Sequence, residues 1–143
     1  MLEKFHVAQK DIVYVDEKRL RTVTKEILMT QDISEKDAIL ATDALIRADL
    51  RGVESHGVSN MLRAYLGAFK SNSLNPKPNW NIVKETPSCA TINSDNGLGI
   101  VVAPQAMEIA VEKAKKTGAG IVTMNNCGHL GMLAYHSMIA SDN

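Results

Sequence analysis

The first part of the chain carries apolar residues at helical spacing, with charged residues on the opposite faces. Two amphipathic helices are predicted there, over 16–30 and from Ser34 to a stop at Gly52, and each begins at a side chain that can cap a helix. A third helix is predicted to begin at Ser55. The stretch 71–79 is dense in turn-forming residues, so it is predicted to be a loop.

After this loop the spacing changes from a helical to a strand-like period. Three strands and two helices are predicted in chain order at 80–84, 89–93, 100–117, 121–124 and 130–140. The chain is thus predicted to have an N-terminal helical segment, 1–75, followed by the beginning of an α/β domain, 76–143. The sequence stops after a helix, where an α/β unit usually returns with another strand. We therefore expect a truncated chain or an isolated N-terminal portion.

Composition narrows the classes of function. The 143 residues include 16 basic and 16 acidic side chains, so no net charge draws the chain to nucleic acid or to an anionic membrane. No stretch approaches the roughly 20 apolar residues of a membrane span, and the N-terminus lacks the apolar core of a signal peptide. The two cysteines, Cys89 and Cys127, have no CxxC or metal-site spacing. We expect a reduced cytoplasmic protein with neither nucleic acid nor membrane as a partner.

A glycine-rich stretch, Gly97-Leu98-Gly99, opens the helix predicted at 100–117. It matches only part of the dinucleotide-binding fingerprint, because Val102 stands in place of the third glycine and no acidic residue follows the next strand. A flexible turn that caps the helix is the favoured interpretation. A dinucleotide contact is the alternative.

Among the histidines, His56 has the most informative surroundings. It lies between Ser55 and Gly57 at the predicted start of a helix, where the dipole and the free backbone N–H groups favour an anion. An imidazole there can exchange a proton near neutral pH. Arg51 and Arg63 flank it and could hold a carboxylate through a bidentate fork. A purely structural role for His56 is the alternative.

The other three histidines are His6, His129 and His136. We expect His6 to be solvated, and His129 to lie in the loop before the last helix rather than within it. The sequence has no HExxH or comparable spacing, so we expect no metal site. A metal-dependent hydrolase built on His56, His129 and His136 is a poorly supported alternative.

Four motifs occur in order along the chain, and they are Ala48–Val58, Asp95–Gly99, Gly118–Val122 and Asn126–Gly131. Together they resemble the malate/L-lactate dehydrogenase family, which also includes L-sulfolactate dehydrogenase, ureidoglycolate dehydrogenase and 2,3-diketogulonate reductase. The resemblance covers nearly the whole chain, from Val15 to Ala140. It implies a layered, mixed-sheet α/β fold, incomplete here, that is not a Rossmann fold.

The resemblance implies an NAD(P)-dependent oxidoreductase, using NAD or NADP, that interconverts 2-hydroxy acids and 2-oxo acids by hydride transfer. Family members are homodimers of longer chains, and they bind the dinucleotide mainly through segments that follow the part present here. By similarity, His56 and His129 are the acid–base candidates. We expect the isolated chain to be inactive. A non-catalytic dimerising or scaffold fragment of such an enzyme is the alternative.

One departure from the family concerns the substrate carboxylate. Many relatives carry an arginine four residues after the histidine of the SHG motif, where this chain has Asn60. Arg63 is one turn further on and shares a helix face with that position, so we expect it to hold the carboxylate. The candidates for contacting substrate are therefore Ser55, Asn60, Arg63 and Arg51.

A stripe of small residues on the second predicted helix bears on the subunit contact. It consists of Ala38, Ala41, Ala44 and Ala48. Such a stripe lets another helix approach closely. The partner helix is expected either in a second subunit or, with equal weight, within the same chain.

Overall fold

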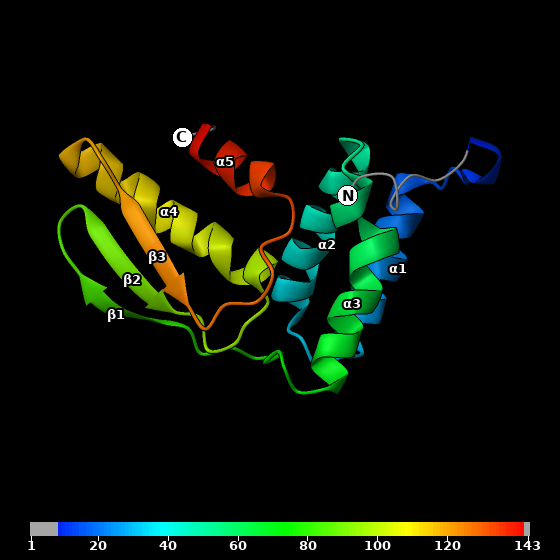
Figure 1. Ribbon diagram of the computed structural model, residues 1–143, viewed down its shortest axis with the longest axis horizontal. Coiled ribbons are helices and arrows are strands. Elements are labelled where there is room, and N and C mark those ends of the chain that lie inside the picture. Colours follow the sequence, from blue (N-terminus) through cyan, green and yellow to red (C-terminus); the bar gives the residue numbers. More distant parts are fainter. Residues whose placement is uncertain (1–8, 142–143) are drawn as a thin grey trace.

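Helices precede a small sheet in the computed structural model, which describes residues 9–141 (Figure 1). The elements are the 3-10 turn η2 (Gln9–Asp11), α1 (Glu17–Met29), α2 (Glu35–Leu50), the 3-10 turn η3 (Glu54–His56), α3 (Val58–Lys70), β1 (Asn81–Glu85), β2 (Cys89–Asn93), α4 (Gly99–Thr117), β3 (Ile121–Asn125) and α5 (Leu133–Ser141). The predicted order of helices and strands is confirmed. Among the described helices, none is both long and apolar enough to cross a membrane. The prediction for His6 lies outside the described residues.

Side-chain caps fix the starts of the first two helices. The carboxylate of Asp16 accepts the backbone N–H of Arg19 at 2.9 Å, and the hydroxyl of Ser34 accepts that of Asp37 at 3.1 Å. Gly52 follows the end of α2 with a φ of 69°, a left-handed conformation that suits glycine. The first two helices therefore begin and end where the sequence predicted.

The third helix begins at Val58 and not at Ser55. Its first turn is capped by a side chain from α2, because the Asp49 carboxylate accepts the Val58 N–H at 2.9 Å. The residues before it form the separate turn η3, closed by the bond from the His56 N–H to the Val53 carbonyl at 2.9 Å. The anion at the start of this helix is therefore the chain's own carboxylate, which corrects the expectation of free N–H groups beside His56.

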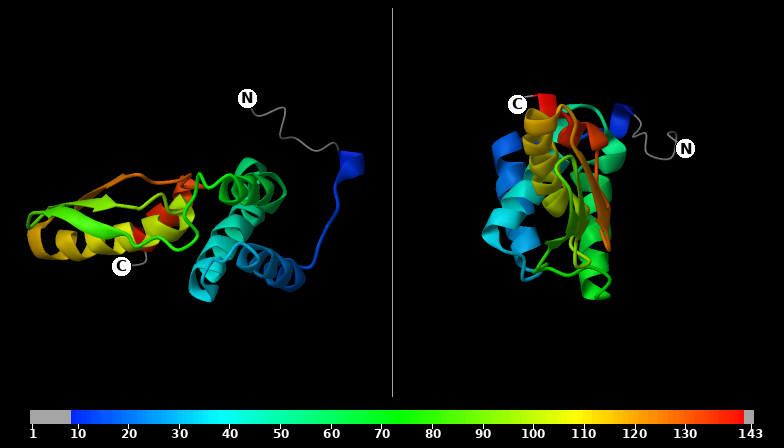
Figure 2. Two further views of the ribbon diagram at one scale, coloured as in Figure 1. Left: turned by 90° about the horizontal axis from the view of Figure 1, so that it is seen from below. Right: turned by 90° about the vertical axis from the view of Figure 1, so that its left-hand side faces the viewer.

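The sheet is mixed, as expected. Its order is β1-β2-β3, with β1 antiparallel and β3 parallel to β2. In the left view of Figure 2, α4 lies along one face of this sheet. Ile92 of β2 is fully buried there against Val102 and Ala106 of α4. All five residues of β1 are exposed, so its stability depends on its ladder with β2.

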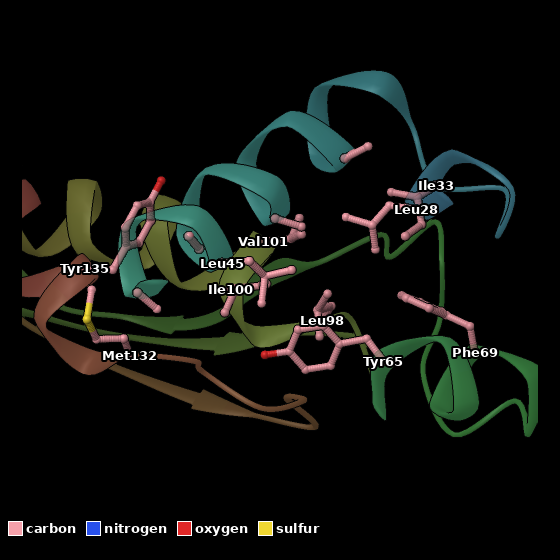
Figure 3. Close-up of a cluster of buried hydrophobic side chains, with 14 residues drawn as sticks. Leu28, Ile33, Leu45, Tyr65, Phe69, Leu98, Ile100, Val101, Met132 and Tyr135 are labelled. Carbon is pink, nitrogen blue, oxygen red and sulfur yellow. The ribbon is translucent and has the colours of Figure 1, made fainter. Parts of the chain in front are cut away.

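The main hydrophobic cluster gathers around α2 (Figure 3). The small-residue stripe lies inside it, since Ala38, Ala41 and Ala48 have no exposed surface and Ala44 has 4%. Helices α1, α3, α4 and α5 all contact α2. The stripe therefore packs within the chain, and the idea that it contacts a second subunit is wrong. The cluster also joins the two predicted segments, because it includes residues from both.

Gly57 provides a test of the Asp49 cap. A Cβ added at Gly57 would overlap the Asp49 carboxylate, whereas one added at Gly67 in α3 would meet nothing within 4 Å. We expect Gly57→Ala to lower the free energy of unfolding by about 1–3 kcal/mol through steric overlap. Gly67→Ala is the matched control and should raise it by about 1 kcal/mol. Urea unfolding measures both, and equal effects of the two substitutions would refute the close approach.

Candidate active site

Two histidines from distant motifs meet at one open cavity. The rings of His56 and His129 stack with their centroids 5.3 Å apart and their planes 16° from parallel. They line a cavity of about 470 Å³ together with Cys127, Gly128, Leu130, Gly131 and Leu133. The two acid–base candidates predicted from the sequence are thus brought together.

The position of His56 is set by the turn η3. The hydroxyl of Ser55 lies 2.8 Å from the Nδ1 of His56 and fixes the rotation of the ring. The amide of Asn60 donates to the Glu54 carbonyl at 2.7 Å, which ties α3 to the start of the turn. The Asp49 carboxylate, which caps α3 beside this turn, has a raised pKa. Burial raises the pKa, the hydrogen bond from the Val58 N–H partly offsets the rise, and the nearby Glu54 carboxylate adds to it.

His129 lies in the loop between β3 and α5, as expected, because α5 begins at Leu133 rather than at residue 130. The chain turns at Gly131, whose φ is 69° and where a side chain would collide with Ile100. This glycine directs its backbone N–H at the Nδ1 of His129, 3.2 Å away. The hydroxyl of Tyr65 lies 3.0 Å from the same nitrogen.

These contacts decide the protonation of His129. A backbone N–H can only donate, so the Nδ1 is an acceptor and the neutral ring carries its proton on Nε2. Burial, and then the neighbouring His56, lower the pKa of His129. Burial also raises the pKa of Tyr65, which keeps its hydroxyl protonated. We infer that His129 is neutral near pH 7.

The two histidine rings are held by the protein in the same way. Each Nδ1 is bonded to the protein, and neither Nε2 is bonded by any residue within 9–141. Both rings line the cavity, so these nitrogens are the atoms left for a bound molecule. Chemically, such a pair can hold one proton and one hydrogen-bond donor beside a single oxygen atom.

The residues predicted to contact substrate are less closely grouped. Ser55 contacts His56, and Asn60 is engaged with Glu54. The Arg51 guanidinium contacts the Met138 sulfur of α5 at 2.6 Å. Arg63 is exposed on α3, and its guanidinium makes no hydrogen bond or ion pair with a residue of the described range. Asn60, Arg51 and Arg63 do not line the cavity.

The sequence did not single out Tyr65 as functional, and it offered His136 only as a candidate metal ligand. The side chain of Tyr65 is buried on α3, and its hydroxyl reaches His129. A hydroxyl on an otherwise apolar face was the available signal. His136 is buried in α5, and its Nε2 lies 2.7 Å from the Leu130 carbonyl. No local pattern pointed to that bond.

Two alternatives were tested against the geometry. Over residues 9–141, no three His, Cys, Asp or Glu side chains are placed to share a metal ion, and His136 directs its Nε2 to a carbonyl. The glycines of the Gly97-Leu98-Gly99 stretch serve close packing: a side chain at Gly97 would overlap Pro78, and one at Gly99 would overlap the His129 carbonyl. The favoured interpretation as a structural turn therefore agrees with the packing.

Comparison with known proteins adds the family. The model of a family described as malate/L-lactate dehydrogenase matches residues 15–143. Malate dehydrogenase of Pyrococcus abyssi is 39% identical over 142 residues, which cover 99% of this chain and 39% of that protein. L-sulfolactate dehydrogenase of Methanocaldococcus jannaschii is 42% identical over 115 residues, 80% of this chain and 33% of that protein.

The fold agrees with this assignment. The solved structure of malate dehydrogenase from Pyrococcus horikoshii OT3 superposes with a TM-score of 0.89 and 38% identity, over 96% of this chain and 39% of that one. The chain thus spans about two fifths of the length of these relatives and corresponds to their N-terminal part. The resemblance seen in the motifs is confirmed: the chain belongs to the malate/L-lactate dehydrogenase family.

Proposed function

We propose that this chain carries the acid–base residues of an oxidoreductase that interconverts 2-hydroxy acids and 2-oxo acids. The observation that carries the proposal is the stacked pair of His56 and His129, whose Nδ1 atoms are held and whose rings line a common cavity. The names of the relatives, malate and L-sulfolactate dehydrogenases, support the substrate class.

In the direction of reduction, hydride reaches the carbonyl carbon and negative charge grows on the carbonyl oxygen. Protonated His56 donates its Nδ1–H to Ser55 and gives its Nε2 proton to that oxygen, which leaves a neutral ring and a hydroxyl group. His129 stays neutral and donates a hydrogen bond from its Nε2–H to the same oxygen. In the direction of oxidation, the Nε2 of His56 accepts the hydroxyl proton.

NAD or NADP is proposed as the hydride carrier. The glycines of the Gly97-Leu98-Gly99 stretch serve close packing against Pro78 and the His129 loop. We therefore assign no residue within 9–141 to the dinucleotide. Assembly as a homodimer in the cytoplasm is part of the proposal and is based on the family resemblance.

Arg63 is proposed to hold the substrate carboxylate. Its guanidinium makes no hydrogen bond or ion pair with another described residue, whereas that of Arg51 contacts Met138. A guanidinium binds a carboxylate through two parallel hydrogen bonds, which makes it suited to a 2-oxo acid.

The chain alone is expected to bind NADH poorly, because the family resemblance places most of the dinucleotide contacts outside the two fifths of the relatives that it matches. Titration of the 143-residue protein should give no saturable change in NADH fluorescence at cofactor concentrations that saturate the Pyrococcus horikoshii enzyme. Saturable binding in that range would contradict the assignment of the cofactor site to other segments.

Turnover can be tested in a chimaera in which this chain replaces the matching part of the Pyrococcus horikoshii enzyme. We expect His56→Ala to lower kcat for 2-oxo acid reduction by about 10²–10⁴-fold, since the proton donor is lost. His6→Ala is the control and should leave kcat unchanged.

His129→Ala in the same chimaera separates the two roles. A large loss with His129→Ala but near-normal turnover with His56→Ala would make His129 the proton donor. Normal turnover in both variants would reject the acid–base assignment and favour a scaffold role for this chain.

The carboxylate contact is tested by Arg63→Lys in the chimaera, because lysine offers a single point charge in place of the planar fork. We expect a clear rise in KM for the 2-oxo acid and little change in KM for the cofactor. Arg51→Lys is the matched control. If only Arg51→Lys raises the substrate KM, Arg51 holds the carboxylate.

A further inference from the structure

We propose that His136 is a positioning residue for His129, acting through the single peptide group that joins Leu130 to Gly131. This inference rests on the proposed function, in which the Nε2 of His129 faces the substrate. It concerns a buried imidazole that takes no part in the proton transfer described above.

The two ends of one planar peptide unit connect the histidines. The Nε2 of His136 lies 2.7 Å from the Leu130 carbonyl oxygen, and the N–H of the same unit, on Gly131, donates to the Nδ1 of His129 at 3.2 Å. Because the peptide group is rigid, a rotation that broke one bond would misalign the other. Because hydrogen bonds in a chain polarise one another, the bond from His136 also strengthens the N–H that faces His129.

The surroundings of His136 determine which of its ring nitrogens carries the proton. A carbonyl oxygen accepts, so the ring must carry its proton on Nε2. Its Nδ1 is buried and bonded by no residue of the described range, and only 6% of the residue is exposed. A ring with its proton on Nδ1 would leave both that N–H and the Leu130 carbonyl without a partner, which is costly in a buried site.

The helix that carries His136 is itself anchored. The neighbouring Tyr135 donates its hydroxyl to the Asp43 carboxylate of α2 at 3.0 Å. Asp43 is also paired with Arg21 at 2.8 Å and with Arg47 at 2.9 Å. The position of His136 is therefore fixed, and its hydrogen bond to Leu130 holds the loop between β3 and α5.

The consequence for His129 has a definite sign. A donor directed at its Nδ1 stabilises the neutral ring and so lowers its pKa. The titratable groups around it are His56, stacked on its face, Tyr65, bonded to its Nδ1, and Cys127, which lines the same cavity. Weakening the Gly131 donor leaves these groups and the burial of the ring in place, and the pKa of His129 should then rise because the neutral ring loses a hydrogen bond.

The first experiment needs no substitution. In the 143-residue chain with ¹⁵N-labelled histidine, long-range ¹H–¹⁵N spectra report the tautomer of each ring. We expect His136 as the Nε2–H tautomer with a slowly exchanging imidazole N–H, and neutral His129 as the Nε2–H tautomer. A proton on the Nδ1 of His136, or an N–H that exchanges rapidly, would overturn the proposal.

The second experiment removes the donor. His136→Phe keeps a buried ring without an N–H, and His136→Gln keeps a donor near the position of Nε2. In His136→Phe we expect the His129 pKa to rise and its tautomers to mix, and in His136→Gln we expect both to return. Ser137→Ala, on the same helix, should change neither.

An unchanged His129 titration in a folded His136→Phe chain would refute the inference. If that variant fails to fold, the tautomer of the natural chain decides alone. None of these signals depends on turnover, so a chimaera that lacks activity while the signals behave as expected counts against the proposed function only.

Discussion

The close packing of α2 is the constraint on which the rest of the structure depends. The small side chains of its alanine stripe allow four other helices to contact α2, and they have almost no exposed surface. Helix α2 also sets the positions of His56 and His129. Asp49 near its end caps α3 beside the turn that holds His56, and Asp43 in its middle anchors α5 and, through it, the His129 loop. A bulkier side chain in the stripe would therefore disturb the site as well as the core.

The electrostatics of the site follow from placing two like groups face to face. Stacked rings 5.3 Å apart disfavour a double positive charge, and burial together with the neighbouring His56 lowers the pKa of His129. The two contacts at the Nδ1 of His129, from Tyr65 and Gly131, come from different elements, so the site requires the assembled fold.

The sequence predicted most of the fold because local signals governed it. Caps at Asp16 and Ser34 set two helices, and the alternation at 89–93 matched β2 residue for residue. The start of α3 was missed because its cap comes from another helix, and the start of α5 was missed because the chain first turns at Gly131, whose φ is 69°. For the site, the motifs identified both histidines. The contacts of Tyr65 and His136 were not predicted, since each side chain acts across elements rather than along the chain.

The two outer strands of the sheet differ in how they meet the solvent. β1 is interrupted by an irregular register between Ile82 and Lys84 and carries charged residues, which are features that discourage edge-to-edge pairing. β3 has no charged residue, exposes 58% of Ile121 and, within the described residues, pairs only with β2. Its free edge is therefore a template for another strand. Aggregation of the purified chain would begin there, and a lysine at position 121 would improve its solubility.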